Sequence, residues 1–512
     1  MAAITVATAV PASAQPATKG AAKGADNGAK AADEPEAQPQ QPNAKLLIGD
    51  AVENADSPQY QQVEEAINRF GNRRVKEARD LLIEVRTTHR QLPPAEILIA
   101  KLFIVYKQPQ LALAELEQAV RKHPKDPEAY LMFADGSLND GHVTAAEALY
   151  RDADELVKSF NENPMRKANF EKRVLQGLAA VAQSRQQWKT AETLLRQLIK
   201  LDPKNAMAYQ RLGIVIFQQA APDDLKTLSE AYSAFTAAID AEPRMPHPDV
   251  AMGQLFEQAA QQALNTGDKA KSNRYRQQAI ESFRRATEPK TKPGLNTLLA
   301  AAMWALQTNQ FKPAQQYADA AMKNDAESLE AKLIAAIVAR FSGNRTVAER
   351  LLKEAYNQSP AFPVSNQLAL VLVESTNASD QKRALELAEI NARANQNNAE
   401  AVSTYGWVLY QLGHKKEAGQ VLENVIRSRA LTPDSAYYVA QILADQGRGA
   451  DAIQILEDAI AQPQPFANRT SAAKLLEETR KKLDSAAGDD EKKDSKSSKS
   501  GSPPARSSKG TK

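Results

Sequence analysis

Apolar and polar positions alternate along residues 59–466 with a regular long period. Alanines that open an apolar helical stripe recur there, and five of the ten intervals between them are 34 residues while none is shorter. Apolar residues at helical spacing predict amphipathic helices. A fixed period of this length predicts stacked repeats, each of which buries its apolar face only against its neighbours. The alanines are Ala78, Ala112, Ala146, Ala191, Ala231, Ala279, Ala314, Ala348, Ala384, Ala418 and Ala452.

Each repeat is predicted to contain two helices. In the stretch STYGWVLYQLGHKKEA, Gly406 stands twelve positions before Ala418, and a small residue takes the same place in most other repeats. Gly413 falls between the two, where glycine ends a helix in the left-handed conformation at little cost. Prolines such as Pro124 and Pro360 close many repeats, because a helix interior excludes them. The stretch is therefore read as helix, turn, helix, with small residues where the two helices approach closely.

This arrangement resembles the tetratricopeptide repeat. In that family the eighth, twentieth and twenty-seventh places are small, the twenty-fourth is bulky and the thirty-second is often proline. Residues 95–124 supply Ala100, Ala112, Leu116, Ala119 and Pro124 in this register. The resemblance implies an all-α fold, a right-handed α-solenoid of about eleven helix-turn-helix repeats.

One repeat and both ends depart from the pattern. The repeat that begins at Pro363 carries Leu370 and Asn391 at two places that are normally small. The end segments are rich in Ala, Gln, Pro, Ser and charge, and such composition buries too little apolar surface to offset the entropy of ordering. We therefore expect five segments: 1–14, a signal-peptide remnant; 15–58, disordered; 59–466, the repeat array; 467–484, an amphipathic capping helix; and 485–512, a disordered basic tail.

The first residues suggest export. A short apolar run leads to Ala12-Ser13-Ala14, a small-x-small pattern suited to signal peptidase, although no Lys or Arg precedes it. One hypothesis places the true start upstream and the protein in a bacterial periplasm or cell envelope. The alternative is a disordered alanine-rich end on a cytoplasmic protein. In either case the longest apolar runs are about half the length that spans a bilayer, so we expect a soluble chain.

Composition narrows the function. Aromatic residues make up 6% of the chain and the net charge is +3, because an acidic N-terminal stretch and a basic tail nearly cancel. This balance argues against a protein whose main task is to bind a phosphate backbone. The tail from Lys492 to Lys512 is either a solvated segment or an electrostatic tether to an anionic polymer or lipid.

The sequence contains no recognisable catalytic or metal-binding motif. The chain has no cysteine, its five histidines are far apart in sequence, and it holds neither an HExxH pair nor a phosphate loop. Carboxylate pairs such as Glu115 with Glu117, and Glu477 with Glu478, are expected to be ordinary solvated charges. The sequence therefore predicts no enzymatic activity, no cofactor, no metal site and no small-molecule substrate.

Recognition of other proteins remains. The resemblance implies that the second, fifth, ninth, twelfth and thirteenth places of each first helix face an inner groove. Exposed Trp and Tyr there would be energetic anchors, although such aromatic stripes also pack between repeats. The Lys and Asn that some relatives use to clamp acidic C-terminal peptides are absent, since the places hold pairs such as Ile97 with Lys101. The candidate groove residues are Glu400, Ser403, Trp407, Tyr410, Gln411, Tyr437 and Gln441.

We therefore expect a non-enzymatic scaffold that binds partner proteins or peptides in this groove. The alternative is an accessory or regulatory subunit of an enzyme complex, in cell-envelope assembly or associated with RNA, with the basic tail as a tether. The sequence does not predict the partner or the oligomeric state, because a fold alone does not determine function.

Overall fold

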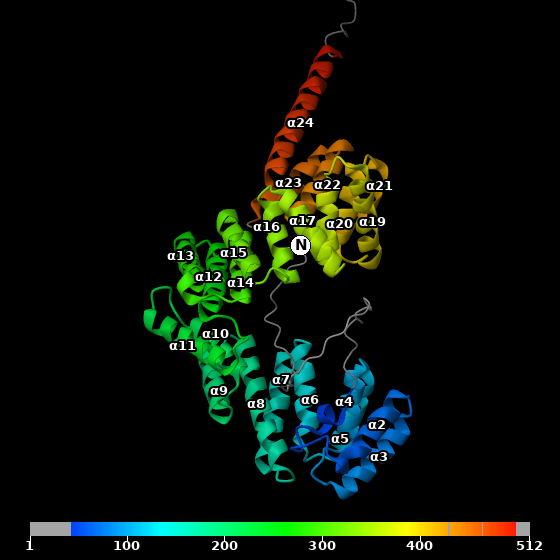
Figure 1. Ribbon diagram of the computed structural model, residues 1–512, viewed down its shortest axis with the longest axis vertical. Coiled ribbons are helices and arrows are strands. Elements are labelled where there is room, and N and C mark those ends of the chain that lie inside the picture. Colours follow the sequence, from blue (N-terminus) through cyan, green and yellow to red (C-terminus); the bar gives the residue numbers. More distant parts are fainter. Residues whose placement is uncertain (1–41, 429–430, 463, 498–512) are drawn as a thin grey trace, which may run out of the picture. The chain divides into compact units, whose positions relative to one another are not determined.

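The computed structural model describes residues 42–428, 431–462 and 464–497 (Figure 1). Within these ranges the chain forms helices joined by turns and no β-strand. The predicted all-α solenoid of about eleven repeats is confirmed, because the described residues contain eleven consecutive helix pairs and one further helix before and after them. The pairs are α2 (Gln61–Gly71) with α3 (Val75–Thr88), α4 (Ala95–Val105) with α5 (Pro109–Lys122), α6 (Pro127–Asn139) with α7 (Val143–Ser159), α8 (Pro164–Ser184) with α9 (Trp188–Leu201), α10 (Ala206–Phe217) with α11 (Leu225–Ala241), α12 (Pro248–Asn265) with α13 (Lys269–Ala286), α14 (Leu295–Gln307) with α15 (Phe311–Asn324), α16 (Leu329–Phe341) with α17 (Arg345–Gln358), α18 (Phe362–Leu372) with α19 (Ala378–Ala394), α20 (Ala399–Gln411) with α21 (Lys415–Ser428), and α22 (Pro433–Asp445) with α23 (Gly449–Ala461).

The chain forms two compact units that divide within α13. The N-terminal unit extends to Ser282 and the C-terminal unit begins at Phe283. Inside each unit a helix packs against its partner in the pair and against helices of the next pair. This contact pattern is expected when stability comes from neighbouring repeats rather than from one central core.

Small residues stand where the helices cross. All eleven alanines that define the period are at most 2% exposed. A Cβ atom on Gly406 of α20 would lie 2.6 Å from Cγ of Leu422 on α21, closer than two carbon atoms pack. Gly413 adopts a φ of +88° in the turn between these helices, a conformation that costs glycine little. The predicted helix, turn, helix reading of this stretch is confirmed.

Asn391 shows how the array accommodates a larger residue at a small place. Its side chain is buried on α19, and its Oδ1 atom accepts a hydrogen bond of 2.9 Å from the Ser365 hydroxyl on α18. Leu370, the other departure in this repeat, is also buried on α18. Ser365 satisfies the amide oxygen of Asn391, whereas the amide nitrogen is buried without a hydrogen-bond partner among the described residues, so the larger residue is accommodated at some cost.

The N-terminal segment departs from the prediction of disorder through residue 58. Residues 44–48 form a short helix, α1 (Ala44–Ile48), which packs against α2 and α4. Leu47 and Ile48 are fully buried there. The average composition of residues 15–58 concealed this local group of apolar residues. Residues 1–41, which include the predicted signal remnant, lie outside the described residues.

The C-terminal end also differs from the prediction. The last helix, α24 (Arg469–Ser497), includes all but the first two residues of the predicted capping helix, 467–484. It continues through residues 485–497, which were expected to be disordered. Asp434 on α22 accepts hydrogen bonds from the backbone amides of Ala467 and Asn468, just before α24 begins. These bonds fix the start of α24 on the last repeat. Residues 498–512 lie outside the described residues.

Candidate partner-binding face

Four successive first helices of the C-terminal unit contribute to one small recess. We call the second, fifth, ninth, twelfth and thirteenth places of each first helix its inner face. Inner-face residues Arg340 of α16, Gln367 of α18, Glu400 of α20 and Asp434 of α22 line the same recess, whose volume is about 20 Å³. The repeat register therefore brings residues up to 94 positions apart to one place. The recess is lined mainly by polar side chains.

Arg340 supplies the positive charge of this recess. Its Nη1 atom donates to Oε1 of Gln367 at 3.1 Å and its Nη2 atom to the Tyr438 hydroxyl at 3.4 Å. Burial by itself lowers the pKa of Arg340, but Tyr438 and Asp434 outweigh burial and raise it. Among the described residues, no carboxylate lies within ion-pair distance of this guanidinium. A half-buried arginine without a carboxylate partner retains donors for an incoming group.

A larger recess of about 490 Å³ lies between α22 and α24. Tyr437 and Gln441 of the inner face line its α22 side, and Leu475 lines its α24 side. Lys474 and Glu478 add charges of both signs to its wall. This recess is large enough for one or two side chains of a guest peptide.

The predicted groove aromatics form one stacked cluster. Trp407 stacks on Tyr438 with ring centroids 4.5 Å apart and on Tyr410 at 5.5 Å, and Tyr437 lies 5.5 Å from the Trp407 ring. Trp407 is 7% exposed and Tyr437 is 9% exposed. The structure therefore places both mainly in the packing between α20 and α22, and the expectation of exposed aromatic anchors does not describe them.

The other candidate residues differ in access. Tyr410 is half-buried and donates its hydroxyl to Oδ2 of Asp445 at 2.8 Å. Burial, together with this bond, raises the pKa of Tyr410 to about 12. Ser403 is buried and donates to the Ala399 carbonyl of its own helix at 2.6 Å. Glu400 lines the small recess, Gln441 lines the large one, and Gln411 is exposed.

The N-terminal unit contains a polar site that the sequence analysis missed. Lys101 on α4 lies 2.6 Å from Glu128 on α6, measured from Nζ to Oε1. The other oxygen of Glu128 lies 2.7 Å from Nη2 of Arg166 on α8, which also pairs with Asp126 at 2.8 Å. Glu128 and Arg166 are fully buried. We call Lys101, Asp126, Glu128 and Arg166 the buried charge cluster.

Two aromatic rings hold the arginine of this cluster. The guanidinium carbon of Arg166 lies 5.2 Å from the ring centre of Phe160 and 5.1 Å from that of Phe170. Stacking on aromatic rings suits the planar guanidinium group. Two signals in the sequence could have indicated the cluster: Lys101 and Glu128 occupy inner-face places, and the interval from Ala146 to Ala191 is 45 residues.

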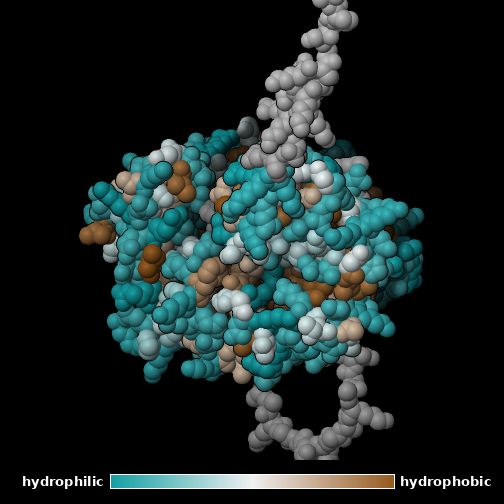
Figure 2. Space-filling view, turned by 90° about the horizontal axis from the view of Figure 1, so that it is seen from above, coloured by the Kyte–Doolittle hydropathy of each residue, from teal (hydrophilic) through white to brown (hydrophobic). Residues whose placement is uncertain are grey.

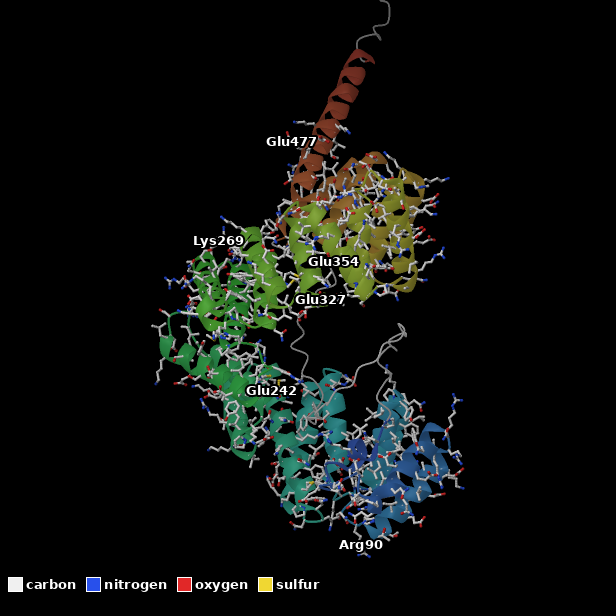
Figure 3. The ribbon with its side chains drawn as sticks, viewed as in Figure 1. Arg90, Glu242, Lys269, Glu327, Glu354 and Glu477 are labelled. Atoms are coloured by element: carbon white, nitrogen blue, oxygen red, sulfur yellow. The ribbon has the colours of Figure 1, made fainter. Side chains whose placement is uncertain are left out.

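The predicted solvated carboxylates separate into two classes. Glu477 on α24 is exposed and lies 2.6 Å from Lys481 on the same helix (Figure 3). Glu115, in contrast, is buried, and its two oxygens accept hydrogen bonds from Arg79 on α3. The prediction for Glu115 is therefore wrong, because a bidentate arginine from the preceding repeat compensates for its burial.

The described residues contain neither a metal-binding cluster nor a membrane-spanning helix. No group of three or more His, Cys, Asp or Glu side chains in the described part is arranged to hold a metal ion. No helix within the described ranges combines the length and apolar character needed to cross a bilayer. The surface visible in Figure 2 is mainly hydrophilic, with hydrophobic residues in separate patches.

Two family models match the sequence. The tetratricopeptide repeat model matches residues 107–159, and the model of anaphase-promoting complex, cyclosome, subunit 3 matches residues 377–482. No curated protein matches the chain.

Several solved structures are similar in part. A thermophilic tetratricopeptide repeat protein of Thermus thermophilus is 19% identical, with 36% of this chain and 99% of that chain covered and a TM-score of 0.31. Yeast Tom70 is 14% identical, with 84% and 97% covered and a TM-score of 0.31. A tetratricopeptide repeat protein of Parabacteroides merdae is 12% identical, with 60% and 99% covered and a TM-score of 0.32.

Proposed function

Because this chain is a tetratricopeptide repeat protein, we propose that it is a non-enzymatic scaffold that binds segments of partner proteins on the inner face of its C-terminal unit. Such repeats generally mediate contacts between proteins. The observation that carries the proposal for this face is Arg340, a half-buried cation in a polar recess with no carboxylate within ion-pair distance among the described residues.

The chemistry of the recess suits a peptide backbone or a carboxylate side chain. Arg340 carries five N–H donors in a planar fork, and the described residues use one on each terminal nitrogen. A guest carbonyl or carboxylate oxygen that approaches the remaining donors would form a charge-assisted hydrogen bond. The small volume of the recess means that the guest lies across its mouth rather than inside it.

Further contacts extend along the same face. The side-chain amides of Gln411 and Gln441 each offer two donors and one acceptor oxygen, which is the chemistry that reads an extended backbone. The recess between α22 and α24 adds an apolar wall at Leu475 for one guest side chain. The buried ring of Trp407 has a supporting role in this proposal, because it holds α20 and α22 in register.

Site-directed photocrosslinking tests the proposal. A benzophenone amino acid replaces Gln411 or Gln441 on the inner face, and the matched control replaces Gln420, which is exposed on α21. In the native host, discrete crosslinked partners are expected from the two inner positions and not from the control. Equal crosslinking from all three positions, or none from the inner positions, would show that partners do not bind this face.

A substitution in the same assay tests the role of the arginine. Arg340→Gln removes the charge and keeps hydrogen-bonding capacity, so crosslinking from Gln441 is expected to fall while the helical circular dichroism signal is retained. Unchanged crosslinking would mean that the guest does not use this cation.

A further inference from the structure

The short N-terminal segment lies on the inner face of the first repeats in the way that a bound peptide would. We call residues 44–52 the resident segment. Leu47 and Ile48 point into the core formed with α2 and α4, whereas the neighbouring Leu46 is 45% exposed. The segment therefore contributes one apolar face and leaves the other in solvent, as an amphipathic guest helix does in a groove.

Side chains of the first helices bind the backbone of this segment. Nζ of Lys101 donates to the Leu47 carbonyl at 3.1 Å. The Asn169 side chain donates to the Asp50 carbonyl at 3.1 Å, and the Asn163 side chain donates to the Ala51 carbonyl at 2.8 Å. Lys101 is on α4, Asn169 is on α8 and Asn163 caps the start of α8. Carbonyl groups that have no partner in a sheet or long helix are thus satisfied by the array.

One side chain of the segment makes an ionic contact. Oδ2 of Asp50 lies 3.1 Å from Nζ of Lys101, which belongs to the buried charge cluster. The cluster itself contains two cations and two carboxylates, so it is balanced without Asp50. A site that is charge-balanced and internally paired when empty is preorganised for a guest, which lowers the cost of binding.

The fit of Asp50 is incomplete. Its Oδ1 atom is buried and has no hydrogen-bond partner among the described residues. Burial raises the pKa of Asp50, although Lys101 opposes this effect. Keeping the Asp50 carboxylate ionised in this site therefore costs free energy. A guest peptide whose carboxylate oxygens both found hydrogen-bond partners would bind more favourably than Asp50 and could displace the segment.

A short polar connection joins the segment to the array. Residues 53–57 have the sequence ENADS; Glu53, Asn54 and Asp56 are exposed, and Ala55 alone packs into the core. The segment can leave its site while this connection keeps it close. A tether of this length gives the resident segment an effective concentration at its site on the order of millimolar. Only partner peptides with a higher affinity than the segment can then displace it.

We propose that the inner face of α2 and α4, together with the start of α8, is a peptide-binding site whose resident ligand is residues 44–52, and that a partner peptide with two adjacent aliphatic residues followed by an aspartate displaces it. This site lies in the N-terminal unit and does not depend on the function proposed for the C-terminal unit. The resident segment then acts as a built-in competitor that sets the affinity threshold for partners.

Binding in trans tests the proposal on the full chain. The probe is a fluorescein-labelled peptide NAKLLIGDAVEN, which corresponds to residues 43–54. A release variant, Leu47→Ser with Asp50→Ala, is expected to bind this probe at least about tenfold more tightly than the unmodified chain, because the internal competitor is weakened. The matched control, Leu46→Ser, changes an exposed leucine and is expected to behave like the unmodified chain.

Two further arms identify the site. Adding Lys101→Met to the release variant is expected to abolish the gain, and a probe that carries the Leu47→Ser and Asp50→Ala changes is expected not to bind. A folded release variant that fails to bind the probe would overturn the proposal. So would a dimer of the unmodified chain in light scattering that dissociates in the release variant, because the segment would then belong to a second copy.

Hydrogen exchange of the unmodified chain keeps the proposal testable if the release variant unfolds. The amides of residues 44–52 are expected to exchange at least about tenfold faster than those of α4, because a displaceable segment opens independently of the array. Equal protection of the two would make the segment a permanent part of the fold and would overturn the proposal.

Discussion

The contact between Gly406 and Leu422 provides a test of the helix packing. The effect of Gly406→Ala on stability is expected to change sign when Leu422 is truncated. A Cβ atom added to Gly406 would meet three side-chain carbons of Leu422 at 2.6, 2.8 and 3.1 Å. Leu422 is 1% exposed, so its side chain is enclosed by its neighbours. Overpacking of this kind costs roughly 1–3 kcal/mol. Replacing glycine by alanine inside a helix stabilises the helix by about 1 kcal/mol, which offsets part of this cost. The net effect of Gly406→Ala is therefore expected to be a destabilisation of α20 and α21 by about 1 kcal/mol.

The opposite sign is expected once Leu422 is truncated. Leu422→Ala removes the three carbons that the new methyl group would meet, and by itself costs about 2–5 kcal/mol as a buried leucine deletion. In that background the steric cost disappears and only the helix-propensity gain of Gly406→Ala remains, about 1 kcal/mol of stabilisation. The coupling between the two substitutions is therefore predicted to be about 1–3 kcal/mol.

Native-state hydrogen exchange is the assay, because a repeat array unfolds locally and a single melting temperature averages over many repeats. The opening free energy of α20 amides is measured for the four members of the double-mutant cycle. Gly406→Ala is expected to lower it in the original chain and to raise it in the Leu422→Ala chain. If Gly406→Ala raised the opening free energy equally in the original chain and in the Leu422→Ala chain, the close approach of α20 and α21 would be refuted.

Three other outcomes are expected. Ala348→Leu, at a fully buried helix crossing, should destabilise the C-terminal unit by about 1–3 kcal/mol. Its control Ala361→Leu, at an exposed position before α18, should change stability by less than about 0.5 kcal/mol. Equal shifts of the melting temperature in the two variants would contradict the register. Burial by itself raises the pKa of Glu128, but the two cations of the buried charge cluster outweigh burial and lower it from 4.5 to about 2. The stability contributed by ionised Glu128 is then complete above pH 4.5 and lost as the pH falls toward 2. The difference between the free energies of unfolding of the original chain and Glu128→Gln, measured by denaturant titration, should therefore narrow over that range. A constant difference would contradict the pairing. Lys107→Gly, at a φ of +56° after α4, should stabilise the N-terminal unit by about 1 kcal/mol, because only glycine adopts this conformation without cost; a lower melting temperature in calorimetry would contradict it.

The repeat fold was predictable because its determinants are local and recur. A helix crossing needs a small residue at a fixed distance from the turn, so the same requirement appears as Ala348, Ala418 and Ala452 in different repeats. Eleven repetitions make the pattern distinct even where a repeat departs from it. The pair Ser365 and Asn391 shows why such departures do not change the fold: the larger polar residue finds a hydrogen-bond partner inside the same repeat.

Access to solvent at the candidate groove was less predictable. The register predicted that Trp407 and Tyr437 face the inner groove, but register alone does not say whether a neighbouring side chain covers such a place. Tyr438, at a place outside the inner-face set, stacks on Trp407 and helps to bury it. Whether an inner-face aromatic is exposed thus depends on the sizes of residues in the adjacent repeat, which vary from repeat to repeat.

The buried charge cluster and the resident segment depend on contacts that the period does not encode. Asn163 binds a carbonyl 112 residues earlier in the chain, and Lys101 binds one 54 residues earlier. These partners lie outside the matching places of neighbouring repeats, so no comparison of one repeat with the next reveals them. Their traces in the sequence are indirect: Lys101 and Glu128 occupy inner-face places, and the interval between Ala146 and Ala191 is lengthened to 45 residues.

That lengthened interval has a physical consequence in the structure. The extra residues give α8 a length of 21 residues, where the first helices on either side of it have 12 or 13. Its first place in the repeat register is Lys172, so about two turns of α8 precede the register. Arg166 and Asn169 lie in those turns, and they hold the buried charge cluster and the resident segment respectively. In this array the regular positions build the scaffold, and the inserted turns supply the residues that distinguish one stretch of the inner face from another.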